Sequence, residues 1–291
     1  LESKGIDVIL VKDLLARMIE DTDYVVNKDL SKITNELAKK GNKYRDQYQE
    51  VVSKDKDVNL SNWPEWLTLS LRADAEEYGE KTAVALNEIL SNRDGLPLSN
   101  VLYARDQSNL LKKTFVFSSM RHEIRQPEVK LYRDALEHAG IISNSGLDVV
   151  CVGGSGRFEG GDGIVYRRDV YIGVGGRTNL EGIMQVAPSI LNQGGRLFVP
   201  IDHERDSGKL CEMGAMHLDT YWMPCGENGV VVCEDEASRR ELLEVTFSSG
   251  SLKTKNIGWF IDHMEKTGME IVPLTKEEQD HFAPNFLNLG N

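Results

Sequence analysis

The sequence has no run of about 18 uncharged apolar residues, so no segment is expected to cross a membrane. Basic residues are in the minority, because 34 Lys and Arg against 46 Asp and Glu leave a formal net charge of −12. Nucleic acids and anionic membrane surfaces attract clustered Lys and Arg, so neither is expected as the main partner. Cysteine is scarce, with four residues and no CxxC spacing, which favours reduced thiols in a cytoplasmic protein.

Both ends of the sequence look interrupted. The chain opens on LESKGIDVILV, which fits a helix tail, a glycine and a strand. It closes on NFLNLGN, which fits a strand and a turn with no return strand. Sheets rarely end on half a hairpin. We therefore expect a fragment that lacks material at both ends.

Two hydrophobic patterns divide the chain. Over residues 12–94 apolar residues recur at helical spacing, as at Leu14, Leu15 and Met18. From about residue 95, short β runs alternate with amphipathic helical segments, which predicts an α/β domain. The opening strand IDVIL is expected to join its sheet. The prediction is thus an α/β domain over residues 1–11 and 95–291, with a helical insertion at 12–94.

The α/β part contains seven predicted strands and three predicted helices. The strands are KTFVFS, LDVVCV, GIVYRRDVYIGV, GRLFVP, GVVVCE, EIVPL and NFLNL. The helices are PEVKLYRDALEHAG, NLEGIMQVAPSI and EASRRELLEVTFSSG. The stretch GAMHLDTYW is also interpreted as a strand, in which alternation would place His217 and Asp219 on one face.

Five stretches place polar residues among apolar ones, which is unfavourable in an ordinary hydrophobic core. They are NVLYARDQ, MRHEIRQPE, GRFEGGDGIVY, GGRTN and GAMHLDTYW. Each stretch has an ordinary structural interpretation. Arg105 beside Asp106 fits a loop salt bridge, Gly-Gly-Asp is a common turn, and His217 fits a hydrogen-bonded core histidine. A metal site is a further possibility in principle, but its candidate ligands match no zinc spacing. Those candidates are His203, Glu204, His217 and Asp219.

Taken together, the charged residues suggest one ligand. Carboxylates such as Asp106, Glu159 and Asp219 can hold a planar cation, whereas Arg125 and Arg177 can hold a carboxylate. A molecule with a guanidinium at one end and an α-carboxylate at the other satisfies both halves. Arginine is such a molecule.

The motifs NVLYARD, MRHEIRQPE, FEGGDGIVYRRDVYIGVGGRTN and MHLDTYW resemble, in this order, those of arginine deiminases. These enzymes belong to the guanidino-group-modifying (amidinotransferase) superfamily. The resemblance implies a five-bladed α/β propeller, the pentein fold, with an inserted α-helical subdomain. It also implies L-arginine as the small-molecule partner and no metal or organic cofactor. Assembly into a homo-oligomer is left open.

The resemblance also assigns roles to individual residues. It implies that Asp106 and Asp219 grip the guanidinium. His217 would act as general acid and base, and Glu159 would hold and polarise it. The remaining substrate-binding positions would be Asn100, Arg125, Arg177 and Asp162. The first three of these would bind the amino-acid carboxylate end, and Arg105 would give structural support.

The family's chemistry requires a cysteine thiolate that attacks the guanidinium carbon, and citrulline and ammonia are its products. The family cysteine lies near the C-terminus, whereas no cysteine follows Cys233 in this sequence. We therefore expect the nucleophile beyond Asn291. Two alternatives stay open: Cys225 or Cys211 is the nucleophile, or the protein is a pseudoenzyme that binds a guanidino ligand. An amidinotransferase or a dimethylarginine hydrolase is a further alternative.

Overall fold

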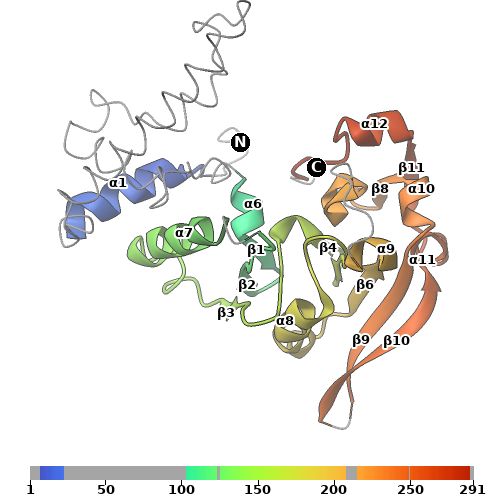
Figure 1. Cartoon of the computed structure of the whole chain (residues 1–291), viewed down its shortest axis with the longest axis horizontal. Coiled ribbons are helices and arrows are strands. Elements are labelled where there is room, and N and C mark those ends of the chain that lie inside the picture. The colour runs from blue at the N-terminus through green and yellow to red at the C-terminus, as the bar shows by residue number, and fades with distance from the viewer. Residues whose placement is uncertain (1–6, 23–102, 123–124, 208–214, 249, 289–291) are drawn as a thin grey trace, which may run out of the picture. The chain divides into compact units, whose positions relative to one another are not determined.

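The computed structural model describes residues 7–22, 103–122, 125–207, 215–248 and 250–288 (Figure 1). The chain forms two compact units. One comprises Leu1–Leu102 and Lys130–Ser145, and the other Tyr103–Val129 and Gly146–Asn291. Most of the predicted helical insertion lies outside the described residues. The predicted domain boundaries therefore stay a prediction.

In the first unit, helix α1 (Val11–Thr22) buries the predicted helical stripe, including Leu14 and Leu15. The preceding segment IDVIL was expected to be a strand, and for residues 7–10 this is wrong. Val8 and Ile9 are exposed, and the carbonyl of Leu10 accepts the first backbone hydrogen bonds of the helix. The segment therefore leads into α1.

The second unit carries the strands and most of the described helices, and it has a mixed α/β fold. Its strands are β1 (Ser108–Leu111), β2 (Thr114–Phe117), β3 (Asp148–Cys151), β4 (Gly163–Tyr166), β5 (Asp169–Ile172), β6 (Leu197–Ile201), β7 (Trp222–Cys225), β8 (Gly229–Cys233), β9 (Glu241–Ser248), β10 (Ser251–Trp259) and β11 (Glu270–Leu274). Its helices are α6 (Ala104–Gln107), α8 (Leu180–Asn192), α9 (His203–Asp206), α10 (Glu234–Ala237), α11 (Phe260–Lys266) and α12 (Lys276–Asp280). Helix α7 (Gln126–His138) begins in this unit and continues into the first.

The strands form three sheets, with the orders β1-β2-β3, β10-β9-β6-β5-β4 and β11-β8-β7. In the middle sheet only β5 and β6 pair in parallel, and the other neighbours are antiparallel. Each three-stranded sheet joins an antiparallel pair to one parallel strand. Short antiparallel pairs extended by a parallel strand are typical of mixed α/β architectures.

Strand β6, in the middle of the five-stranded sheet, is buried on both faces. Leu197 and Val199 point into one apolar core, together with the inner face of α8. Phe198 points into the other, together with Trp222 of β7 and Phe260 of α11. A strand with both faces covered contains a continuous apolar run, as β6 does.

Helix α8 confirms the helix predicted for the amphipathic segment NLEGIMQVAPSI. Asn179 caps it by accepting a hydrogen bond from the backbone of Gly182 at 2.9 Å. Ile183, Val186 and Ile190 lie three or four residues apart and are fully buried. Capping and a single apolar face together explain why this helix forms where the sequence indicates.

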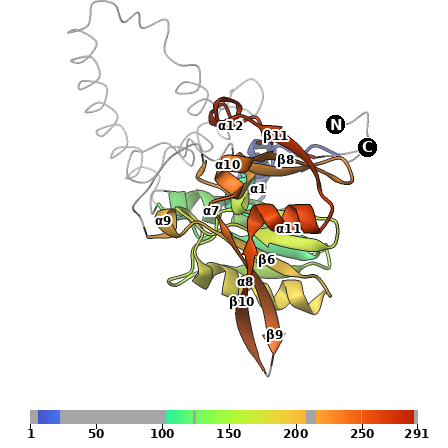
Figure 2. The ribbon, with the colours of Figure 1, turned by 90° about the vertical axis from the view of Figure 1, so that its right-hand side faces the viewer.

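The expected helix in EASRRELLEVTFSSG is wrong, because most of this segment is strand β9, paired with β6 and β10. Leu242 and Val245 are three residues apart, which resembles helical spacing. In the strand they point to opposite faces, and each is buried in a different core. Figure 1 and Figure 2 both show β9 and β10 extending from the sheet as a long hairpin.

The expected strand NFLNL also differs from the structure. Its described part, up to residue 288, has no regular secondary structure, and Phe286 packs against the core shared by β7 and β8. None of the helices in the described part of the chain is long and apolar enough to span a bilayer.

Replacement of Phe198 should test the two-core arrangement. Its ring is 2% exposed and lies 5.2 Å from that of Tyr171, centroid to centroid. We expect Phe198→Ala to lower the free energy of unfolding by about 3–5 kcal/mol in denaturant titrations. The matched control is Phe247→Ala on β9, where the ring is 62% exposed and the expected loss is close to zero. Equal losses for both variants would contradict the arrangement.

Candidate functional site

A buried carboxylate and a buried imidazole form the centre of the site. Glu159 directly precedes the 3-10 turn η5 (Gly160–Asp162), and His217 directly precedes the turn η7 (Leu218–Thr220). The Nε2 atom of His217 lies 2.9 Å from Oε2 of Glu159. The Glu159 side chain is 0% exposed and that of His217 6%, so water screens this pair very little.

The segment GAMHLDTYW is not the expected strand. Its backbone is extended at His217, turns through η7, and becomes strand β7 only at Trp222. The amide and hydroxyl of Thr220 both donate to the carbonyl of His217, at 3.1 and 2.6 Å, and this closes the turn. His217 and Asp219 therefore come together through a turn, and the alternation argument for them was wrong.

Two glycines allow close approach to the turn η5: Gly161 lets the His217–Asp219 segment approach, and Gly160 lets α6 approach. A Cβ atom on Gly161 would lie 2.6 Å from Nδ1 of His217 and 3.1 Å from Oδ1 of Asp219. A Cβ on Gly160 would lie 1.7 Å from the carbonyl oxygen of Arg105. Any larger residue would push these groups apart, so the Gly-Gly pair is needed for this close approach.

The predicted arginines Arg125 and Arg177 both lie at the central carboxylate. One guanidinium nitrogen of Arg177 is 3.4 Å from Oε2 of Glu159. Arg125 is buried, and its NH1 lies 3.0 Å from Asp106 and 3.8 Å from Glu159. Four of the predicted residues thus join Glu159 in one set of charged contacts: Asp106, Arg125, Arg177 and His217.

The two other predicted acids lie at the edges of this set. Oδ1 of Asp162 accepts the amide of Leu218 at 2.9 Å and so ties η5 to η7. Oδ2 of Asp219 accepts a hydrogen bond from Arg105 NH1 at 2.9 Å. Asp106 lies near enough for its charge to raise the pKa of both His217 and Asp219.

Three buried polar atoms at the site have no hydrogen-bond partner among the described residues. They are Oδ2 of Asp162, Oδ1 of Asp219 and NH2 of Arg125. An unpaired buried polar atom is costly, so it commonly marks a place where a ligand or water binds. Two of the three are carboxylate oxygens, which favours a ligand that donates hydrogen bonds.

The central pair is held as carboxylate and imidazolium. Burial alone would raise the pKa of Glu159, but the hydrogen bond and charge of His217, the charge of Arg177 and the Arg121 amide lower it to about 2. Burial would likewise lower the pKa of His217, but Glu159 and two nearby aspartates raise it to about 9. At neutral pH the imidazole therefore carries a proton.

The pKa values of Asp162 and Asp219, the two acids at the edges of the site, are raised, whereas that of Glu159 is lowered. Burial raises the pKa of Asp162 to about 7, against the opposing effects of His217 and of hydrogen bonds from Thr178 and Leu218. Burial also raises the pKa of Asp219, although His217 and Arg105 oppose the shift. A nearby cation stabilises the ionised form of a carboxyl group whose pKa is raised by burial. Asp162 and Asp219 therefore favour a positively charged ligand.

Sequence reasoning missed three residues that support the site. Oε2 of Glu128 accepts from Nε of Arg125 at 3.1 Å and from Nε2 of Gln107 at 3.0 Å. The hydroxyl of Thr178 accepts the amide of Glu159 at 3.1 Å. The i, i+3 spacing of Arg125 and Glu128 at the start of a helix was a usable signal for the first contact. The other contacts depend on tertiary structure.

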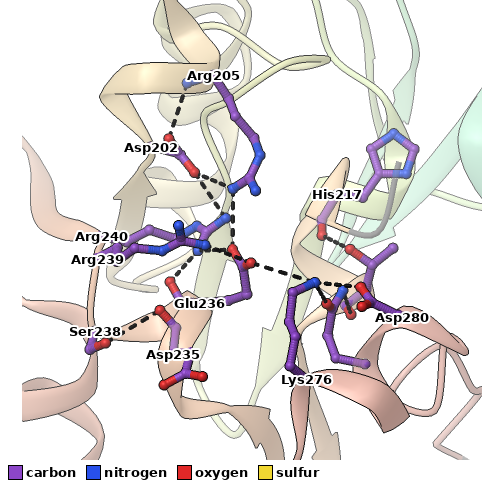
Figure 3. A network of polar contacts seen from close by, with 12 residues as sticks. Asp202, Arg205, His217, Asp235, Glu236, Ser238, Arg239, Arg240, Lys276 and Asp280 are labelled. Atoms are coloured by element: carbon purple, nitrogen blue, oxygen red, sulfur yellow. Dashed lines mark hydrogen bonds and ion pairs between the residues drawn. The ribbon is translucent and has the colours of Figure 1, made fainter. Parts of the chain in front are cut away.

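A second charged network supports the segment that follows η7 (Figure 3). The Arg240 guanidinium carbon lies 3.9 Å from the centre of the Tyr221 ring. Arg240 is itself bound to Glu236 of α10 at 3.0 Å and to Asp202 at 3.1 Å. Arg240 and Glu236 are both buried. The network therefore holds the Arg240 guanidinium in place against the ring of Tyr221, which directly follows η7.

Two candidate residues, Asn100 and Cys211, lie outside the described residues, so their predicted roles stay predictions. The other three cysteines lie within them. Cys151 is exposed at the end of β3, and Cys233 is buried in an apolar core. Cys225 lies at the hairpin end of β7, where a Cβ on Gly229 would be 2.8 Å from its sulfur.

The metal alternative finds no support in the described ranges, where no three His, Cys, Asp or Glu side chains gather around a possible ion. Of its four candidates, His203 lies on α9, and its Nε2 is 3.5 Å from Glu241. His217 and Asp219 instead contact Glu159 and Arg105.

The solved structures to which this chain is similar are distant in sequence. A ternary complex of AgrE with ornithine and NAD+ is 17% identical with a TM-score of 0.47, over 66% of this chain and 24% of AgrE. The product-bound N-terminal domain of ArgZ, an arginine dihydrolase from cyanobacteria, is 16% identical with a TM-score of 0.47, over 66% and 59%. A dimethylarginine dimethylaminohydrolase adduct is 17% identical with a TM-score of 0.43, over 62% and 58%. The matched region thus spans only about a quarter of AgrE.

No curated protein matches the chain. The family model described as arginine deiminase, however, matches residues 1–291, which is the whole sequence. That match agrees with the resemblance of the four ordered motifs, all of which contribute residues to the contacts around Glu159 and His217. The protein belongs to the arginine deiminase family.

Proposed function

We propose that this protein is an arginine deiminase, which hydrolyses the guanidinium of L-arginine to L-citrulline and ammonia. The observation that carries the proposal is the buried Glu159–His217 pair bordered by Asp162 and Asp219, each with an unpartnered buried oxygen. Such a site offers a proton donor beside acceptors for a planar cation. Family membership supplies the expected reaction class.

Asp106 and Asp219 are proposed to hold the guanidinium nitrogens of the substrate. Asp219 is buried and keeps one oxygen free of described partners, so a bound cation would satisfy it. Asp162 is proposed to contribute in the same way from η5. Because carboxylates hold guanidinium groups through charge-assisted hydrogen bonds, this set favours guanidino compounds over simple amines.

His217 is proposed to act first as a general acid. In the proposed reaction a thiolate attacks the guanidinium carbon, and the C–N bond to the leaving nitrogen breaks as His217 gives that nitrogen a proton. Water then loses a proton to the neutral imidazole and attacks the carbon, and the C–S bond breaks to release citrulline. Glu159 stabilises the imidazolium at both stages, which suits a histidine that must hold a proton at neutral pH.

The thiol is proposed to lie beyond Asn291 in the full gene product, because Cys151 is exposed at the end of β3 and Cys233 is buried in an apolar core. Cys225 and Cys211 stay alternative nucleophiles. Arg177, together with Asn100 and Arg125, is proposed to bind the substrate carboxylate. Arg177 is the better placed of the two described arginines, because Arg125 is already bound by Asp106 and Glu128.

A guanidino-binding pseudoenzyme is the second candidate, and the positions of Cys151, Cys225 and Cys233 favour it. The three separate sheets are proposed to be blades of the five-bladed α/β propeller, since each contains an antiparallel pair extended by a parallel strand.

Turnover should be tested with the full gene product. We expect it to release citrulline and ammonia from L-arginine in equal amounts, measured by colorimetric and coupled assays. Asp219→Ala should abolish the reaction, because the guanidinium would lose a binding partner next to His217. Failure to turn over any guanidino compound would sink the enzyme proposal, and binding without turnover would favour the pseudoenzyme.

Binding can be tested on the present chain by calorimetry. We expect L-arginine to bind, and Asp219→Asn to weaken binding by about 10- to 100-fold, because one charge-assisted hydrogen bond is lost. Asp235→Asn on the exposed face of α10 is the matched control and should leave affinity unchanged. An Asp219→Asn variant with unchanged affinity would argue against the guanidinium clamp.

The protonation of His217 predicts a specific pH dependence. Its pKa is raised to about 9 in the folded protein and should be near 6.5 when unfolded. Its contribution to stability is therefore complete below about pH 6.5 and is lost as pH rises through 9. Imidazole NMR titration should show one of the six histidines titrating near 9. Glu159→Gln should lower that pKa, and a wild-type His217 pKa below 6.5 would contradict the ion pair.

A further inference from the structure

Arg105 and Asp106 are consecutive on α6, yet their side chains have different partners. Asp106 pairs with Arg125, whereas NH1 of Arg105 donates to Oδ2 of Asp219 at 2.9 Å. The Arg105 side chain is 30% exposed and that of Asp219 only 4%. Arg105 therefore reaches from a partly open position to a buried carboxylate that the proposed function assigns to the substrate.

The contact leaves half of the Asp219 carboxylate available. Arg105 uses Oδ2, while Oδ1 is buried and has no partner in the described part of the chain. Oδ1 and Nδ1 of His217 both border the same face of Gly161, where an added Cβ would lie 3.1 and 2.6 Å from them. The free oxygen is thus on the His217 side of the carboxylate.

Arg105 is anchored at two further points. Its NH2 donates to the carbonyl of Phe286 at 3.4 Å, and its own carbonyl packs against Gly160. The planar Arg105 guanidinium is bound by two acceptors, the carbonyl of Phe286 and the carboxylate of Asp219. Its NH1 donor therefore points at Asp219 in a defined direction. A carboxylate accepts from several directions, so Asp219 can keep Arg105 on one oxygen and bind another donor on the other.

We propose that Arg105 is a positioning residue that stays bound to Oδ2 of Asp219 and turns Oδ1 towards the guanidinium of the ligand. This inference rests on the proposed function, since it assumes that Asp219 binds a guanidino compound. The opposite arrangement is that the Arg105 guanidinium occupies the ligand's place and is displaced on binding. The two arrangements differ in the sign of the effect when Arg105 is removed.

Burial gives the contact a second consequence. The charged groups that act on the Asp219 carboxyl are His217, Arg105 and Asp106, and of these only Asp106 disfavours its ionised form. Removing Arg105 would leave His217 to oppose both burial and Asp106. Asp219 would then take up a proton at higher pH and lose its ability to accept a guanidinium.

The test measures L-arginine binding by calorimetry between pH 6 and 8 for Arg105→Met, Arg105→Lys and the wild-type chain. We expect Arg105→Met to bind about 10- to 100-fold more weakly at pH 6 and to recover as pH rises. Arg105→Lys should restore part of the affinity. Tighter binding by Arg105→Met would overturn the proposal, and so would a loss that does not change with pH. The matched control is Arg196→Met, which removes an exposed arginine bound to Asp169 and should behave as wild type.

A second measurement separates this inference from the proposed function. Carbon NMR of labelled aspartate follows the titration of Asp219 without any ligand, with Asp219→Asn used for assignment. We expect the pKa of Asp219 to rise in Arg105→Met and to be largely restored in Arg105→Lys. If wild type fails to bind arginine, the proposed function fails and this titration still decides the role of Arg105. An unchanged Asp219 titration in Arg105→Met would overturn the inference.

Discussion

The buried ion pair between Glu159 and His217 is the constraint on which the rest of the site depends. A fully buried carboxylate is tolerated only when several donors satisfy it. Glu159 has the His217 imidazole at 2.9 Å, the Arg121 amide at 3.0 Å and Arg177 at 3.4 Å. These donors come from three distant segments, so one carboxylate fixes the relative positions of the loops that carry the candidate residues.

The same ion pair determines the charge of its surroundings. Because Glu159 keeps His217 protonated, a positive charge lies next to Asp162 and Asp219 and partly offsets their burial. The positive charge of His217 offsets the burial only in part, since the pKa values of Asp162 and Asp219 both remain raised. Glu159 at the centre of the site therefore has enough donors and positive charge around it, whereas Asp162 and Asp219 at its edges have too little positive charge beside them. Such an imbalance favours binding of a cation without requiring the protein to keep fully unpaired ionised acids.

The sequence indicated more of the candidate site than of the fold around it. The EGGD and HLDT motifs drew attention to Glu159 and His217, because several polar residues in apolar surroundings stand out in a sequence. Leu242 and Val245 misled the fold prediction, since a strand buried on both faces imitates helical spacing. The turn at His217 was missed because hydrogen bonds from Thr220 and contact with Asp162 replace strand pairing. Those contacts come from tertiary structure, which local periodicity does not report.

In the absence of a ligand, arginines of this chain already pair with two of the acids proposed to bind the guanidinium: Arg125 with Asp106, and Arg105 with Asp219. If Asp219 had no partner, its burial and the charge of Asp106 would favour its protonated form, and a neutral carboxyl is a poor acceptor for a guanidinium. Arg125 and Arg105 each take a single oxygen of these acids, at 3.0 and 2.9 Å. At Asp219 this partial occupation favours the charged form and leaves Oδ1 without a partner among the described residues. A site built for a guanidinium can therefore use guanidinium groups of its own as supports, provided that each binds the side of the carboxylate that faces away from the ligand.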